Sequence, residues 1–215
     1  MRKSIIYLYV CIIILLHSCS KDDPPKGIVE DIEGNKYETV ILGDQEWMAE
    51  NLRTSKYRNG VDIQYLVNCT DWRYAKNGVY NYYNNDSNNI KIHGNLYNYY
   101  AVMDSNNIAP IGWHIPTQED FEKFLNYCDK NGGADKILYD SDGFNFKSSG
   151  KIIDYPYPPC FFNINEYGYY YGYSVTSETD KTTIIFTNDF INSKKFRIGL
   201  SWGFTHGYSI RCVKD

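Results

Sequence analysis

The clearest helical pattern of this chain lies in Pro116-Thr117-Gln118-Glu119-Asp120-Phe121-Glu122-Lys123-Phe124-Leu125-Asn126-Tyr127-Cys128. Thr117 suits the N-cap position, and the acidic side chains after it favour the positive end of a helix. Apolar residues recur along one helix face, and a Gly-Gly pair ends the pattern. The stretch predicts one amphipathic helix over residues 117–130, with an apolar face made of Phe121, Phe124, Leu125 and Cys128.

The segments on both sides of this helix are typical of short strands joined by tight turns. Glu33-Gly34-Asn35 and Gly43-Asp44 are turn sequences between runs of β-branched and aromatic residues. Similar runs return over the last 50 residues and end in a strand at residues 208–213. A weaker helical pattern predicts a second helix at about residues 96–103. These elements predict an α+β fold.

The beginning of the chain predicts a lipoprotein signal. A basic start precedes an apolar run over residues 5–16, and Leu16-His17-Ser18-Cys19 places a cysteine at the cleavage position. The run is shorter than the roughly 20 residues that a membrane-spanning helix needs. We therefore expect residues 1–18 to be a signal peptide that is removed, and Cys19 to be lipidated. A signal peptide without lipidation is the alternative.

Residues 19–27 are predicted to be a lipidated tether, made semi-rigid by Pro24-Pro25. Ser20-Lys21-Asp22-Asp23 resembles the short acidic export tag of Bacteroidetes lipoproteins that are displayed outside the cell, and an acidic, soluble tether is the alternative. We expect an outer membrane lipoprotein on the cell surface, held to the lipid bilayer by its acylated N-terminus. Residues 28–215 are long enough for one domain, and no second boundary is visible.

Charge narrows the expected binding partners, and the cysteine content bounds the possible disulfides. Without the signal peptide the chain has 20 basic and 26 acidic residues, a formal charge of −6, which argues against nucleic acid as a partner. Cys69, Cys128, Cys160 and Cys212 then remain beside the lipidated cysteine. In an oxidising compartment these four permit two disulfides with three pairings, and their spacing does not choose among them.

Tyrosine is unusually abundant, with 22 residues, and the excess is concentrated at residues 80–100 and 155–173. A tyrosine joins a large apolar ring to a polar hydroxyl group, so it suits half-buried strands. It also suits surfaces on which rings stack against sugars or peptides. Composition leaves both interpretations open.

Four ordered motifs resemble the landmarks of the Fibrobacter succinogenes major paralogous domain. They are Gly94-Asn95-Leu96-Tyr97-Asn98-Tyr99-Tyr100-Ala101-Val102, Gly112-Trp113-His114-Ile115-Pro116-Thr117, Ser174-Val175-Thr176-Ser177-Glu178 and Gly207-Tyr208-Ser209-Ile210-Arg211-Cys212-Val213-Lys214-Asp215. The opening, with Glu46-Trp47-Met48-Ala49-Glu50-Asn51-Leu52, is similar to the start of that family. The resemblance spans nearly all of residues 28–215. His114 is expected in the packed core of such a domain.

The same landmarks are distantly similar to formylglycine-generating enzymes, a branch of the C-type-lectin-like fold. In that group a cysteine late in the helix is bonded to one in the last strand, which implies a disulfide between Cys128 and Cys212. The alternative is that Cys128 is a small buried hydrophobic residue. Cys69 and Cys160 would then be left for a second disulfide.

The resemblance implies no enzyme. Formylglycine-generating enzymes use a redox-active cysteine pair shortly before the last strand, and residues 161–208 contain no cysteine. The Glu-Pro-Asn or Gln-Pro-Asp tripeptide of calcium-dependent lectins of this fold is also missing from the sequence. We therefore expect no catalytic residues, no metal and no cofactor.

A ligand would then have to be bound by aromatic rings and hydrogen bonds. The richest candidates are Tyr155, Tyr157, Tyr167, Tyr169, Tyr170, Tyr171, Trp202 and His206. The leading prediction is a non-catalytic binding or adhesive domain for a glycan or a protein. A structural subunit or tip of a surface fimbria-like assembly is the alternative, and a carbohydrate-active enzyme comes third.

Overall fold

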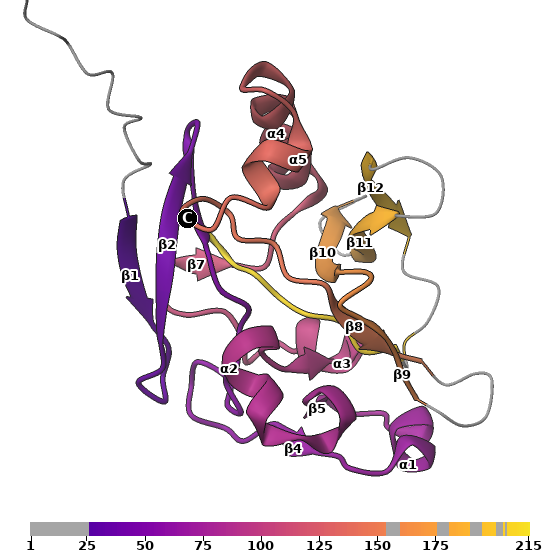
Figure 1. The fold of residues 1–215 in the computed structure, drawn as a ribbon. Helices are drawn as coiled ribbons and strands as arrows, with labels where there is room; N and C mark the ends of the chain where they lie inside the picture. Colours follow the sequence, from indigo (N-terminus) through magenta and orange to yellow (C-terminus); the bar gives the residue numbers. More distant parts are fainter. Residues whose placement is uncertain (1–25, 154–159, 176–180, 190–194, 201–203, 205) are drawn as a thin grey trace, which may run out of the picture.

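The computed structural model describes residues 26–153, 160–175, 181–189, 195–200, 204 and 206–215 (Figure 1). Five antiparallel strands form one sheet in the order β1-β2-β3-β13-β7. Their bounds are β1 (Lys26–Glu30), β2 (Lys36–Leu42), β3 (Gln45–Met48), β7 (Trp113–His114) and β13 (Val213–Lys214). The predicted turns join β1 to β2 and β2 to β3, with positive φ angles of 81° at Gly34 and 70° at Gly43. Both hairpin predictions are confirmed.

Smaller sheets surround this one. The first has the order β4-β5-β6 and consists of β4 (Gln64–Tyr65), β5 (Val79–Asn81) and β6 (Leu96–Tyr97). The second pairs β8 (Ser149–Ile152) with β9 (Phe161–Ile164). The third has the order β10-β11-β12 and consists of β10 (Tyr169–Val175), β11 (Lys181–Asp189) and β12 (Lys195–Leu200). With the helices, these sheets make the fold α+β.

The predicted long helix is confirmed as α4 (Gln118–Lys130). Thr117 is its N-cap, and Thr117 and Asp120 form a reciprocal capping box. The other helical elements are short: α1 (Cys69–Tyr74), α2 (Ile90–His93), α3 (Tyr99–Val102), α5 (Ala134–Leu138) and the 3₁₀ turns η1 (Tyr83–Asn85) and η2 (Ser87–Asn89). Among the described residues, no helix is long and apolar enough to cross a membrane.

The helix predicted at residues 96–103 is wrong in its first part. Leu96 and Tyr97 form strand β6, and α3 is a single turn that begins after Asn98. The Asn98 side chain accepts hydrogen bonds from the backbone N–H groups of Val79 and Ala101, both at 3.0 Å. The Asn98 side chain therefore joins strand β5 to helix α3, and it caps α3.

Residues 207–213 link the described sheets and cross the middle of the molecule (Figure 1). Backbone bridges join this linking segment to the three smaller sheets, at Ile152 in β8, Tyr97 in β6 and Tyr170 in β10. Its carbonyl groups also accept hydrogen bonds from the N–H groups of Leu52 and Met48, at 2.9 and 3.0 Å. The linking segment continues into β13, in the middle of the five-stranded sheet.

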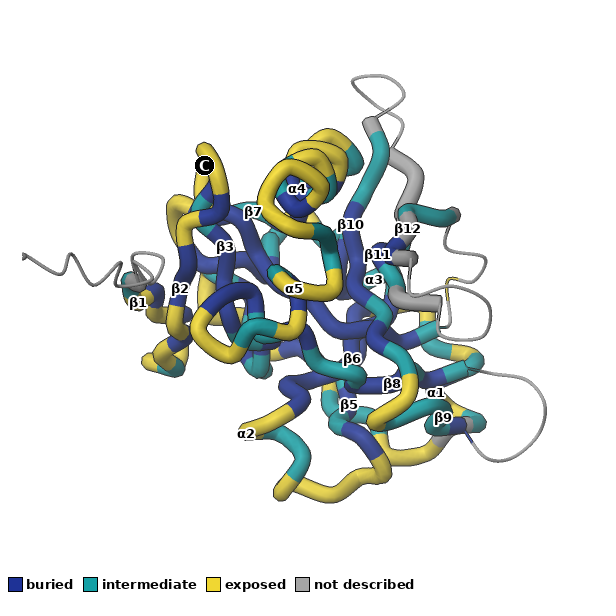
Figure 2. Tube along the Cα trace, turned by 45° about the horizontal axis from the view of Figure 1, so that its top comes forward, coloured by how far each residue is buried: buried dark blue, intermediate teal, exposed yellow. Residues whose placement is uncertain are grey.

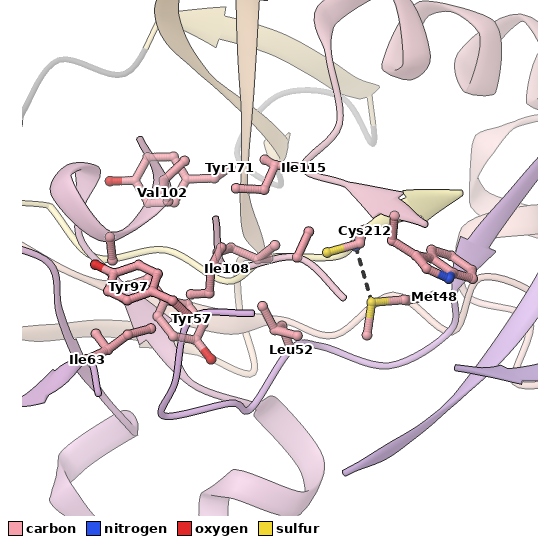
Figure 3. Close-up of a cluster of buried hydrophobic side chains, with 14 of the residues drawn as sticks. Met48, Leu52, Tyr57, Ile63, Tyr97, Val102, Ile108, Ile115, Tyr171 and Cys212 are labelled. Atoms are coloured by element: carbon pink, nitrogen blue, oxygen red, sulfur yellow. Dashed lines mark hydrogen bonds between the residues drawn. The ribbon is translucent and has the colours of Figure 1, made fainter. Parts of the chain in front are cut away.

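Side chains of the linking segment alternate between two hydrophobic clusters, as expected for extended backbone. Ile210 and Cys212 belong to the central cluster, which also contains Met48, Leu52, Tyr97 and Tyr171 (Figure 3). Val213 belongs to the α4 cluster, which contains Trp47, Phe121, Phe124, Cys128, Tyr170 and Phe186. The helix face predicted from sequence is thus buried against Trp47 and aromatic rings from later strands, and Figure 2 shows the buried core running beneath α4.

The predicted disulfide between Cys128 and Cys212 is absent, because both residues are buried free thiols. Cys212 lies in the central cluster, where its backbone N–H donates to the sulfur of Met48 at 3.4 Å (Figure 3). Cys128 lies in the α4 cluster. Neighbouring residues of an extended segment point to opposite faces, so Val213, not Cys212, meets α4. Cys128 is instead a small buried hydrophobic residue, the alternative interpretation.

The other predicted pair, Cys69 and Cys160, stays a prediction. Cys160 is buried and disulfide-bonded. The side chain of Cys69 lies outside the described part of the structure.

Candidate functional site

Two of the predicted ligand-binding tyrosines are core residues. Tyr170 is 1% exposed in the α4 cluster, and Tyr171 is 0% exposed in the central cluster. Both hydroxyl groups are used internally, since Tyr170 donates to the carbonyl of Lys147 and Tyr171 to that of His206, each at 2.9 Å. The prediction of ligand contact at these two positions is wrong, because both side chains are buried.

The other predicted residues divide into two groups. Tyr167 and Tyr169 are partly buried neighbours, with ring centroids 6.2 Å apart. His206 is also partly buried, and its Nδ1 lies 2.8 Å from the hydroxyl oxygen of Tyr208. Tyr155, Tyr157 and Trp202 lie outside the described residues.

A partly exposed aromatic platform lies at the start of α3 and was not predicted. It consists of Tyr99, Tyr100 and Phe204, and Phe204 is 60% exposed. The ring of Phe204 meets Tyr99 edge-on, with centroids 4.7 Å apart, and lies 6.4 Å from Tyr100. Asn98 places the two tyrosines by capping α3 directly before them. Exposed rings in this arrangement offer flat apolar faces to a ligand.

An open groove of about 380 Å³ begins where α3 ends. Val102 and Met103 line it and follow Tyr99 at i+3 and i+4, so they share its side of α3. The complete lining is Val102, Met103, Asp104, Ser105, Asn107, His114, Ile115 and Tyr173. This volume falls within the range of small-ligand sites, and the lining combines apolar side chains with polar groups.

His114 forms the polar end of the groove and lies between two carboxylates. Its Nε2 is 3.1 Å from Asp120 and its Nδ1 is 2.7 Å from Asp215. The hydrogen bond with Asp120, followed by the one with Asp215, raises the pKa of His114 against the lowering effect of burial. Both ring nitrogens are therefore occupied. The prediction that His114 lies in the packed core is confirmed only in part, because its ring is partly exposed.

Asp120 is held in its charged form by the same contacts. Burial alone would raise the pKa of its carboxyl group, but hydrogen bonds from His114 and Thr117 outweigh burial and lower the pKa to about 2. Gln45 also donates to Asp120 at 3.0 Å. Asp120 thus joins the start of α4 to β3 and β7.

Asp104 and Tyr173 complete the groove walls. Asp104 accepts a hydrogen bond from the backbone N–H of Asn106 at 2.8 Å. Burial, with smaller contributions from Asp120 and Asp215, raises the pKa of Tyr173. The groove therefore presents a carboxylate, a phenol and hydroxyl or amide groups, which can form hydrogen bonds with a polar ligand. The described residues contain no group of three His, Cys, Asp or Glu side chains that could hold a metal ion.

The platform and the groove lie within a domain that is matched along nearly its whole length by one family. A family profile described as the Fibrobacter succinogenes major domain covers residues 40–214. This chain belongs to that family. No curated protein and no solved structure matches the chain. The predicted resemblance to the major domain is confirmed.

In this major domain, Arg211 of the last sequence landmark has a structural role. Its side chain is 1% exposed, and it donates to the side chain of Asn51 and to the carbonyl of Asn145, each at 2.7 Å, and to the carbonyl of Phe144. Its guanidinium carbon lies 4.6 Å from the centroid of the Phe144 ring. Burial lowers its pKa. Arg211 therefore holds the segment before β8 against the linking segment.

Sequence reasoning missed Tyr99, Tyr100, Phe204 and Tyr173 as site residues. A partial signal existed, because Asn98 is a good N-cap that would place Tyr99 and Tyr100 in a first helical turn. Phe204 lies between Trp202 and His206, which were both predicted. The convergence of these residues on α3 depends on tertiary contacts and is not encoded in local spacing.

Proposed function

We propose that this major domain is a non-catalytic binding domain whose α3 surface contacts a glycan or a protein. The observation that carries the proposal is the partly exposed aromatic platform of Tyr99, Tyr100 and Phe204 beside the groove. Ring stacking contributes about 0.5–1.5 kcal/mol per aromatic pair beyond the burial of apolar area. The groove adds hydrogen-bonding groups that would fix the orientation of the ligand.

A non-catalytic role is supported by the chemistry of the groove. A general base must reach the proton that it removes. Both nitrogens of His114 are within hydrogen-bond distance of carboxylates. We therefore assign His114 a positioning role in the groove and propose no reaction.

The proposed cellular setting is that of a surface lipoprotein anchored through Cys19. The support is the signal pattern over residues 1–18 and the acidic residues that follow Cys19. For the architecture, we propose a C-type-lectin-like arrangement. Its support is that α4 begins directly after Ile115-Pro116-Thr117 and that β13, from the last landmark, pairs with β7 and β3.

The experiment compares two variants of the purified full chain in detergent, on glycan arrays and on host cells. Replacement of Tyr100 and Phe204 by Ala should weaken binding at least tenfold, because it removes one partly exposed and one exposed ring of the platform. Tyr74→Ala is the matched control, since Tyr74 is a 68% exposed tyrosine on α1. Equal binding by the platform variant and the wild type would contradict the proposal.

A fimbria-like structural subunit is the second candidate function, and β1 favours it. Within the described residues β1 pairs with β2 alone, and Ile28 on it is 71% exposed. An unpaired strand edge can accept a strand from another chain. Ile28→Lys should then abolish any higher oligomers seen by light scattering of the full chain, and a wild type that stays monomeric would count against this function.

A further inference from the structure

Lys151 is a partly buried lysine that lacks a hydrogen-bond acceptor. Its neighbours in β8, Gly150 and Ile152, are buried, so the Lys151 side chain points away from the core. Its Nζ lies 4.4 Å from the centroid of the Tyr169 ring. Among the residues that the structure describes, no oxygen lies within hydrogen-bond or ion-pair distance of this Nζ.

Other partly buried lysines of the described chain differ in this respect. Lys56 pairs with Asp62, and Lys147 donates to the side chain of Asn145 at 2.7 Å. An ammonium group has three N–H donors, and a tyrosine ring face attracts its charge without accepting a conventional hydrogen bond. Lysine is rarely withdrawn from water unless it is paired. Lys151 thus has unused donors beside aromatic rings.

The rings beside Lys151 form a row at the start of β10. Tyr169 lies 6.2 Å from Tyr167 and 5.7 Å from Tyr208, and the ring planes are inclined by 37° and 32°. Tyr167 and Tyr169 are partly exposed, whereas Tyr208 is buried and fixes the row from below. A saccharide ring could pack on the exposed faces while a group on its rim reaches Lys151.

Burial lowers the pKa of Lys151, and no carboxylate of a described residue contributes to the shift. Burial raises the pKa of Tyr169 to about 12, with smaller contributions from Tyr167 and Glu166. A bound anion would favour the charged form of Lys151 and would leave the phenols neutral. The local charge is therefore suited to an anionic ligand.

We propose that Lys151, Tyr167 and Tyr169 form a binding site for an acidic saccharide. The sugar ring packs on the tyrosines, and its carboxylate accepts hydrogen bonds from Nζ of Lys151. The site is separate from the α3 surface, because Tyr169 and the groove residue Tyr173 are roughly 13 Å apart along an extended strand. It therefore does not depend on the function proposed above.

The test uses the purified full chain and two probes with the same sugar rings, the charged tetragalacturonate and its uncharged methyl ester. We expect the acid to bind at least tenfold more tightly than the ester, with the difference shrinking as salt is added. Lys151→Met should abolish the difference, and Lys151→Arg should retain it. Lys56→Met is the control, because Lys56 is another partly buried lysine. Equal affinity for acid and ester in the wild type would overturn the proposal.

A second measurement follows the titration of Lys151 by carbon NMR at its Cε. Tetragalacturonate should raise the midpoint, whereas the methyl ester should not. Asp154, which lies outside the described residues, is the nearest acid in sequence, so Asp154→Asn tests whether Lys151 has an internal partner. A lowered midpoint in Asp154→Asn would overturn the proposal.

A sulfated tetrasaccharide tests whether the site selects a carboxylate. Binding as tight as that of tetragalacturonate would mean that the site recognises negative charge without selecting a uronate. The platform variant at Tyr100 and Phe204 should keep its preference for the acid. This separates a failure of the site at Lys151 from a failure of the α3 surface.

Discussion

His114 connects three elements through one imidazole ring. It lies on β7, its Nε2 contacts Asp120 in the first turn of α4, and its Nδ1 contacts Asp215 beyond β13. The protonated ring can donate to both carboxylates, whereas the neutral ring has one donor and one acceptor. Loss of a proton therefore replaces one of the two hydrogen bonds by a repulsive contact.

This arrangement predicts a pH dependence of stability. The pKa of His114 is raised in the folded state, so its contribution is fully present below the unfolded value of about 6.5 and is lost as pH rises through the raised value. Urea unfolding over a pH series should show a falling free energy of unfolding in that window. In His114→Gln the fall should be absent, and His206→Gln should keep it. A wild type whose stability is flat there would contradict the prediction.

Asp120 makes the free energy of unfolding depend on pH in the acid range. Its pKa is lowered to about 2, so its contribution is present above its ordinary value and is lost as pH falls toward 2.

The core and platform tyrosines should respond differently to truncation. Tyr171→Ala should cost about 3–5 kcal/mol of unfolding free energy, because it removes a fully buried ring and its hydrogen bond to His206. Tyr100→Ala should stay within about 1 kcal/mol, because Tyr100 is partly exposed. Urea midpoints of the two variants check this, and similar losses at both positions would show that Tyr100 is a core residue.

At the scale of elements, Gly207 controls how closely the linking segment approaches α1 and β8. A Cβ atom at this position would lie 2.7 Å from Cζ2 of Trp72 and 3.0 Å from Cβ of Ile152. Gly207→Ala should therefore destabilise the domain by about 1–3 kcal/mol through overpacking. Gly60→Ala is the contrasting variant, because no atom lies within 4 Å of its added Cβ, although its φ of +86° adds backbone strain. Thermal melts that place Gly207→Ala level with the wild type would refute the close approach.

Local sequence signals predicted the elements that depend on local interactions. The cap at Thr117 and the apolar spacing of α4 gave its limits closely, and the turn glycines gave both hairpins. These local signals failed at Tyr97, whose strand conformation comes from pairing with Tyr80 in β5 and with Tyr208 far along the chain. Secondary structure that is imposed by distant partners overrides helical spacing.

The candidate site was less predictable for the same reason. Composition identified a tyrosine-rich segment but could not tell which faces of β10 are covered. Tyr170 and Tyr171 point to opposite faces, and each meets a different hydrophobic cluster. The predicted disulfide between Cys128 and Cys212 was wrong by one residue. Val213, and not its neighbour Cys212, lies beside α4.

For the molecule as a whole, attachment to the membrane should depend on one residue, Cys19. Cys19→Ala should release the protein from the membrane fraction, because the proposed acyl chains are all carried at that position. Membrane retention of this variant would refute the lipoprotein proposal. As a companion, Lys21, Asp22 and Asp23 are replaced by Ala, and undiminished surface labelling of intact cells would refute the export-tag proposal.

Residues 207–213 also determine when this molecule folds. They leave the ribosome after the strands of the smaller sheets, yet Ile152, Tyr97 and Tyr170 all pair with them. Loop-closure entropy makes such distant pairings slow to form. Before they form, we expect the nascent chain to lack a closed core. Under the proposed export, a chain in that state can still pass through a translocation channel, and we expect its tertiary structure to be completed beyond the membrane.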